Sequence, residues 1–303
     1  MESQYKSVNL RVADRDLKYF IFDWDDNILH MPTRIYLEKR DENGNWVDHA
    51  VSTAVFAVIR GDTINYRPPQ GDWDLAFKDF QDYAEDKESS FLKDTRAALE
   101  RVLNQDEPPA PSYTRLKETL IEGRLFAIVT ARGHASDSIK AAVELFIDLA
   151  LTPQERQTML ANLRGYRAAF DGEKGDEPDE EVMQYYLSLN RYHAVTNPNF
   201  KKWINNVAGE GASLENPKQF AIRDFVEHVA NLMSQSEEGL GHRSISVGFS
   251  DDDLDNVKAV EKYIRDELSS QFPSVKFVVY DTSDSKIENG RKVVIAGQLD
   301  FGF

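Results

Sequence analysis

The sequence predicts an α/β protein in which a largely parallel sheet carries helices on both faces. Apolar residues dominate the runs at 17–22 and 125–129, as expected for parallel strands that are buried on both sides, and the segment SISVG at 244–248 is a third strand candidate. Segments with helical spacing separate these runs along the chain, as in strand-helix-strand units. The 303 residues, 41% of them hydrophobic and 29% charged, are typical of a folded chain of one elaborated domain or about two.

The first third of the chain opens with the apolar strand at 17–22. Residues 34–67 then have a β-like pattern, in which RIYLEKR and AVFAVIR flank the polar segment 41–45, so we expect a hairpin there. Residues 74–103 have helical spacing. The segment 106–112 holds three prolines, which end a helix and mark a junction.

A new unit begins after this junction. We expect a helix at 113–121 that ends at Gly123, then the strand at 125–129 and a helix at 136–151. The acidic segment 171–181 is typical of a solvated loop between helices.

The last part of the chain continues the alternation. A short strand is expected at 191–195 and an amphipathic helix at 220–233. The strand at 244–248 is followed by a helix at 257–268 and a strand at 275–280. This order favours a doubly wound sheet.

Composition excludes several functional classes. With 36 Lys and Arg against 52 Asp and Glu, the net charge is −16, so nucleic acid is an unlikely partner, although a small phosphorylated molecule is compatible with a locally positive pocket. The sequence has no cysteine, which excludes disulfides, thiol catalysis and thiolate metal sites. We find neither a targeting pattern nor a membrane-spanning run and expect a cytoplasmic protein without a membrane partner; the oligomeric state stays open.

Polar residues follow three of the predicted strands at the point where each strand ends. In open α/β sheets these ends meet where ligands bind, so we expect the side chains to converge. Several carboxylates in one place require a cation, and an all-oxygen donor set favours Mg²⁺. The residues concerned are Asp23, Asp25 and Asp26, then Thr130, and then Asp251 and Asp252.

These segments resemble the motifs of the haloacid dehalogenase (HAD) superfamily. FIFDWDDNIL resembles its first motif, AIVTARG its second and SVGFSDDDLDN its acidic fourth, while Lys218 in NPKQFAIRDFV fits the lysine of the third. The order of the motifs also agrees. The chain departs from the family pattern at Asn27, where Thr or Val is usual, at Asp26, where Gly is commonest though Asp also occurs, and in the GFSDDD form of the acidic motif.

The resemblance implies phosphoryl transfer through an aspartyl-phosphate. Asp23 would be the nucleophile, and Asp25 would protonate the leaving oxygen and then activate water. Mg²⁺ would be held by Asp23, by the backbone carbonyl of Asp25 and by Asp251 or Asp252. The choice between the last two carboxylates stays open.

The resemblance also supplies donors for the phosphate. Thr130 and Lys218 would bind the phosphoryl oxygens, although Lys201 or Lys202 is an alternative to Lys218. Arg132 has two interpretations, an ion-paired or surface arginine and a ligand of the substrate anion.

The first acidic string, DWDDN at 23–27, has two other interpretations. Asp and Asn are favoured in turns, so the string could be a strand-end turn without function. An EF-hand loop is excluded because Ile28 stands at its glycine position and Arg34 at its final glutamate position.

The resulting hypothesis is a Mg²⁺-dependent phosphomonoester hydrolase that acts on a small phosphorylated metabolite. A phosphotransferase of the same family and a catalytically silent HAD-like binding domain are the alternatives. The expected HAD-like Rossmannoid core comprises 1–30, 112–134 and 217–303, with a cap-like insert at 31–111, a hairpin followed by helices, and a mostly helical insert at 135–216. In this superfamily such inserts commonly select the substrate.

Overall fold

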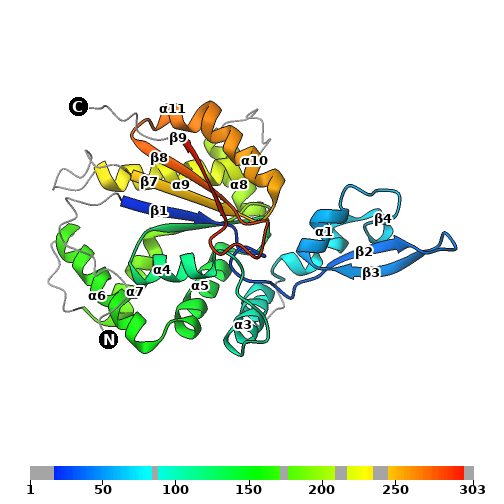
Figure 1. The fold of residues 1–303 in the computed structure, drawn as a ribbon, viewed down its shortest axis with the longest axis horizontal. Helices are drawn as coiled ribbons and strands as arrows, with labels where there is room; N and C mark the ends of the chain where they lie inside the picture. The colour runs from blue at the N-terminus through cyan, green and yellow to red at the C-terminus, as the bar shows by residue number, and fades with distance from the viewer. Residues whose placement is uncertain (1–16, 84–87, 171–176, 209–216, 235–244, 297–303) are drawn as a thin grey trace.

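Six strands form the central sheet of the protein, which we describe from a computed structural model over residues 17–83, 88–170, 177–208, 217–234 and 245–296 (Figure 1). The strand order is β6-β5-β1-β7-β8-β9, and the first five strands run parallel. The last strand, β9, pairs antiparallel to β8. The strands are β1 (Leu17–Phe22), β5 (Phe126–Thr130), β6 (Arg191–Ala194), β7 (Ile245–Asp251), β8 (Val275–Asp281) and β9 (Arg291–Ala296).

Strand β1 lies in the middle of the sheet, at the place where the order of the chain reverses. It pairs with β5 on one side, Phe20 opposite Phe126, and with β7 on the other, Phe20 opposite Gly248. From β1 the chain forms β5 and β6 on one side of the sheet and then β7, β8 and β9 on the other side, as in doubly wound folds. The carboxyl ends of β1 and β7 flank the crevice in which such folds bind ligands.

Helices cover both faces of this sheet (Figure 1). One face carries α4 to α7, and the other carries α9 and α10, with α8 beside α9. The helices are α3 (Ser90–Leu103), α4 (Tyr113–Ile121), α5 (Ser136–Ala150), α6 (Pro153–Phe170), α7 (Asp179–Leu189), α8 (Pro198–Ala208), α9 (Pro217–Ser234), α10 (Leu254–Tyr263) with a π-helical continuation Ile264–Leu268, and α11 (Ser269–Gln271). The predicted α/β class with helices on both faces is confirmed.

Residues 35–80 project from the carboxyl end of the sheet as a smaller unit (Figure 1). Its antiparallel sheet has the order β3-β2-β4 and encloses a small apolar core with its short helices. The elements are β2 (Ile35–Arg40), β3 (Trp46–Val51), α1 (Thr53–Ile59), β4 (Tyr66–Arg67), the 3-10 turn Pro69–Gly71, α2 (Trp73–Ala76) and the 3-10 turn Lys78–Phe80; the small core comprises Ile35, Leu37, Val51, Ala76 and Phe80. We call residues 35–80 the insert. The last part of the expected insert 31–111 packs differently, because α3 lies against α5 and its Phe91 and Leu99 belong to the main core.

The expected hairpin is present, but its second strand is not the one predicted. Residues 46–51 pair with β2, whereas the segment AVFAVIR lies mainly in helix α1. The Oγ of Ser52 accepts a hydrogen bond from the N–H of Val55 and starts this helix. Apolar residues in an alternating order resemble a strand, but Phe56 and Ile59, three residues apart, pack on the small core, as a helix requires.

Three other segments differ from the prediction. The helix expected at 74–103 is interrupted, because the chain turns at Phe77 and Phe80 into the core of the insert and becomes helical again only in α3. The N-terminal part of the acidic segment, 171–176, lies outside the described residues, while 179–181 form the first turn of α7, where carboxylates are favoured. Strand β9, the antiparallel edge, was not predicted.

The predicted end of α4 is confirmed. Gly123 follows the helix with φ +64°, a left-handed conformation that glycine adopts without a steric penalty. Among the helices of the described residues, none is both long enough and apolar enough to cross a membrane.

Candidate functional site

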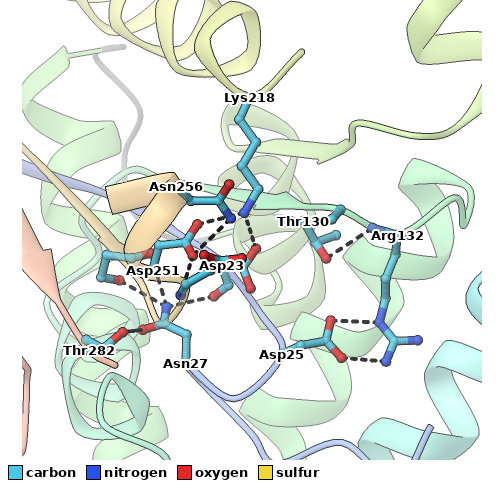
Figure 2. Close-up of polar contacts among 12 residues, drawn as sticks. Asp23, Asp25, Asn27, Thr130, Arg132, Lys218, Asp251, Asn256 and Thr282 are labelled. Atoms are coloured by element: carbon cyan, nitrogen blue, oxygen red, sulfur yellow. Dashed lines mark hydrogen bonds and ion pairs between the residues drawn. The ribbon is translucent and has the colours of Figure 1, made fainter. Parts of the chain in front are cut away.

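The site is built around the loop that follows β1. The N–H of Asp23 donates to the carbonyl of Ser250 at 3.0 Å, so the pairing of β1 with β7 extends to the first carboxylate. The chain then turns sharply: Asp26 has φ 52°, and the N–H of Ile28 donates to the carbonyl of Trp24 at 2.9 Å. This turn places Asp23 and Asp25 at one end of the sheet with separate partners (Figure 2).

Lys218 connects the ends of β1 and β7. Its Nζ lies 2.8 Å from Oδ1 of Asp23 and 2.6 Å from Oδ2 of Asp251, and all three side chains are buried (Figure 2). The lysine stands in the first turn of α9, so the helix start aims it at the strand ends. We call Asp23, Lys218 and Asp251 the core cluster. The alternatives Lys201 and Lys202 are exposed on α8.

Asn27 fixes the strand ends around this cluster. Its Nδ2 donates to the carbonyl of Asp23 at 2.8 Å and to Oγ of Ser250 at 3.0 Å. Its Oδ1 accepts from the hydroxyls of Ser112 and Thr282, each at 2.8 Å. One buried amide thus joins β1, β7, the residue after β8 and the start of α4.

In the sequence, Asn27 was distinguished only as a departure from the usual Thr or Val. Its partners Ser112 and Thr282 lie 85 and 255 residues away in the chain. Isolated Ser and Thr residues carry no signal that would have identified them.

Burial and neighbouring charges shift the pKa values of Asp23, Lys218 and Asp252. Burial raises the pKa of Asp23 to about 7, against the opposing effect of Lys218, and the negative charge of Asp251 adds to the rise. Burial, followed by the charges of Asp23 and Asp251, raises the pKa of Asp252 well above its ordinary value. Burial lowers the pKa of Lys218, but attraction to its two carboxylates outweighs this, so the pKa is raised and the ammonium keeps its charge.

Asp25 has a different partner. Its Oδ2 accepts from Nε of Arg132 at 2.8 Å and its Oδ1 from Nη2 at 2.6 Å, a bidentate pair (Figure 2). The guanidinium lies 4.5 Å from the ring centre of Phe80 and 5.1 Å from that of Phe91, and its Nη2 also donates to Oγ1 of Thr33 at 2.7 Å. We call these five residues the seam cluster because they lie where the insert meets the sheet.

The structure also locates the remaining predicted site residues. Thr130 ends β5, is buried, and its Oγ1 accepts from the N–H of Arg132 at 3.4 Å (Figure 2). Oδ1 of Asp251 accepts from the N–H of Asp253 at 2.9 Å and from Asn256 at 3.3 Å. Asp252 follows β7 and is half-buried.

Helix α1 of the insert makes polar contacts with both strand ends. Thr53 donates a hydrogen bond to Asp26 in the loop after β1. Arg60, seven residues further along α1, pairs with Asp253 at 2.7 Å and with Asp255 at 2.6 Å after β7. The insert is thereby held beside the candidate site.

The carboxylates fit Mg²⁺ by donor type. Asp23, Asp251 and Asp252 offer only oxygen ligands. A divalent cation would favour the ionised form of all three, whose charges would then exceed the single charge of Lys218 by two, which that cation would balance. Within the described ranges, no three such side chains are arranged as a ready metal site. The positive charge between Asp23 and Asp251 in this structure is the ammonium of Lys218.

Comparison with family models finds no match to this chain, and neither does comparison with curated proteins or with solved structures.

Proposed function

We propose that the protein is a Mg²⁺-dependent phosphomonoester hydrolase with a HAD-like core, acting through an aspartyl-phosphate on a small phosphorylated metabolite. One observation carries the proposal: Lys218 bridges Asp23 and Asp251 at the carboxyl ends of β1 and β7. The segments that resemble motifs one, three and four are distant in the chain, and their contact through Lys218 supports the proposal.

In the first step, a carboxylate oxygen of Asp23 attacks phosphorus and the bond to the ester oxygen breaks. Asp25 donates a proton to the departing oxygen, so the products are an alcohol and the phosphorylated aspartate. In the second step, Asp25 takes a proton from water, the resulting hydroxide attacks phosphorus, and the bond to Asp23 breaks. Inorganic phosphate leaves and both carboxyl groups return to their starting states.

The other polar residues stabilise the negative charge that develops on the phosphoryl oxygens. Lys218 contributes a positive charge, and Thr130 a hydroxyl, to its oxygens. Asp23, the carbonyl of Asp25 and Asp251 or Asp252 would hold Mg²⁺, which would supply further charge stabilisation. Asn27 keeps the strand ends in place while this charge changes.

We propose that the insert selects the substrate. Helix α1 contacts the loop after β1 through Thr53 and the segment after β7 through Arg60. Helix α1 therefore lies beside the loop that carries Asp23, and the group attached to a phosphate on Asp23 would meet its side chains.

The test is the release of phosphate from p-nitrophenyl phosphate and from sugar and nucleotide monophosphates, with and without Mg²⁺. We expect Mg²⁺-dependent turnover that Asp23→Asn lowers at least about 10³-fold, because the nucleophile is lost. Asp281→Asn, at the end of the neighbouring strand β8, is the matched control and should keep its activity.

Two results would change the proposal. Turnover that rises with an added alcohol, with the phosphoryl group found on that alcohol, would identify a phosphotransferase. A folded protein that binds Mg²⁺ and turns over no substrate would favour a silent binding domain.

A further inference from the structure

Arg132 lies between the two hydrophobic cores of the protein. Its guanidinium stacks on Phe80, which belongs to the core of the insert, and on Phe91, which belongs to the main core. Arg132 is only 1% exposed. A buried arginine enclosed by two aromatic rings has little freedom to turn.

The edge of the same guanidinium holds Asp25. Nε and Nη2 each donate to one oxygen of the carboxylate, and Nη2 is shared with Thr33, whose hydroxyl contacts Asp94. A planar fork that binds both oxygens fixes the plane of a carboxylate, whereas the ammonium of a lysine fixes only a distance.

The backbone around Arg132 is tied to the insert as well. The N–H of Gly133 donates to the carbonyl of Phe80 at 2.7 Å, and the N–H of Thr196 donates to the carbonyl of Arg132 at 3.3 Å. A shift of the insert that moves Phe80 therefore displaces both the loop and the ring on which the guanidinium rests.

We propose that Arg132 is a positioning residue, which orients the carboxyl group of Asp25 toward the leaving oxygen and couples that orientation to the docking of the insert through Phe80. The inference rests on the proposed function and goes beyond it, because it gives Arg132 a role other than binding the phosphate.

The rival role for Arg132 is direct binding of the substrate anion. Two of its three nitrogens already bind Asp25, and the third, Nη1, is buried without a hydrogen-bond partner in the described part of the chain. Figure 2 shows Nη1 on the side of the guanidinium that faces away from Asp25 and the core cluster. The geometry thus favours the positioning role.

The two roles predict different responses to the leaving group. An alkoxide is a poor leaving group and needs a proton from Asp25, whereas p-nitrophenolate leaves without one. A change that misorients Asp25 therefore slows alkyl phosphates selectively. A change that weakens binding of the phosphate slows both classes alike.

The experiment compares kcat and KM of the wild type and Arg132→Lys on p-nitrophenyl phosphate and on an alkyl phosphate, with Mg²⁺. We expect kcat on the alkyl phosphate to fall about 10²-fold and kcat on p-nitrophenyl phosphate to change several-fold at most, because only the first needs the general acid. KM should change little for either substrate.

A second pair of variants tests the coupling to the insert without altering the arginine. Phe80→Leu removes the stacked ring, and we expect it to lower the ratio of alkyl to nitrophenyl turnover about 5-fold, as the loss of one cation–π contact allows. Phe77→Leu is the matched control, because Phe77 packs on Phe80 in the same small core; it should leave the ratio unchanged.

Several outcomes would overturn the inference. An equal fall on both substrates with a higher KM and weaker inhibition by inorganic phosphate would make Arg132 a phosphate ligand. An equal fall with a lower melting temperature would make it a structural residue only. An unchanged ratio in Phe80→Leu would remove the coupling. A wild type without Mg²⁺-dependent turnover of either substrate would instead overturn the proposed function, and this inference with it.

Discussion

Asp23 and Asp25 stand two residues apart, yet their buried ion pairs are built differently. Asp23 shares Lys218 with Asp251, and all three belong to the main sheet and the helix beside it. Asp25 has Arg132 to itself, and Arg132 rests on rings from two separate cores. The core cluster has two carboxyl groups for one cation, whereas the seam cluster has one carboxyl group, that of Asp25, for one cation.

This difference has a physical consequence. An ammonium on a flexible stem exchanges one anion for another without losing a fixed geometry, so the core cluster suits a site that accepts phosphate and a cation. A guanidinium fork holds one carboxylate in one plane, so the seam cluster suits constant orientation. The geometry of the core cluster therefore depends on charge, whereas the geometry of the seam cluster depends on the position of the insert.

The largest expected effect comes from removing the lysine of the core cluster. Lys218→Met leaves buried carboxylates without their cation, so we expect the free energy of unfolding to fall by about 3–5 kcal/mol in the absence of divalent ions. Mg²⁺ should restore part of this loss. Urea unfolding with and without Mg²⁺ measures both. Lys201→Met, at an exposed position on α8, is the control and should change stability by less than about 0.5 kcal/mol. Unchanged stability of Lys218→Met would contradict the proposed charge balance.

The seam should respond to acid through His134. Burial, followed by the charge of Arg132, lowers the pKa of this imidazole from 6.5 to about 4, against weaker opposing effects of Asp82 and Asp25. The unfolded chain therefore binds the proton more readily than the folded one. This contribution to stability is complete above pH 6.5 and is lost as the pH falls toward 4.

We expect the wild type to lose about 3 kcal/mol of stability through this histidine between pH 7 and pH 4. Urea unfolding of the wild type and of His134→Gln at both values measures the contribution as a difference, which removes the effect of other titrating groups. The same pH dependence in both proteins would show that His134 is not buried in the neutral form.

A smaller effect is expected where the core cluster is held by neutral hydrogen bonds. Asn27→Ala removes the acceptor of Ser112 and Thr282 and the donor to Ser250, so we expect a loss of about 2 kcal/mol. The loss should be the same with and without Mg²⁺, in contrast to Lys218→Met. Asn43→Ala, exposed in the hairpin loop, serves as the control. A loss that Mg²⁺ reverses would mean that Asn27 acts on the charges and not on the backbone.

The smallest effect on stability is expected from the exposed ion pairs between the insert and the segment after β7. The side chain of Arg60 is 38% exposed and pairs with Asp253 and Asp255, so Arg60→Ala should cost at most about 1 kcal/mol, and less at high salt. Thermal unfolding at two salt concentrations measures it. A loss above about 2 kcal/mol that salt does not change would show that this pair, and not the seam cluster, holds the insert in place.

The parts of the fold predicted from sequence are those in which one pattern dominates. The apolar runs of β1 and β5 end at Asp23 and Thr130, and the structure has these residues at the strand ends. Helix α1 was missed because a short apolar run satisfies a strand period as well as a helical one.

The site was predicted to a similar extent. The resemblance of two segments to the family motifs led to Asp23 and Lys218, which the structure brings within 2.8 Å. The partner of Asp25 was not identified, because Arg132 is 107 residues away and its surroundings are supplied by the insert. Pairing across such distances depends on the folded arrangement, which local pattern does not encode.

The covalent state of Asp23 during turnover tests the account most directly. Asp25→Asn, incubated with p-nitrophenyl phosphate and Mg²⁺ and quenched with acid, should accumulate the phosphorylated enzyme, because the substrate needs no proton to leave and the second step lacks its base. Mass spectrometry of the peptide that contains residue 23 should find one phosphoryl group on Asp23, and none in the Asp23→Asn, Asp25→Asn double variant. If the wild type releases phosphate but Asp25→Asn carries no phosphoryl group on Asp23, the account is contradicted.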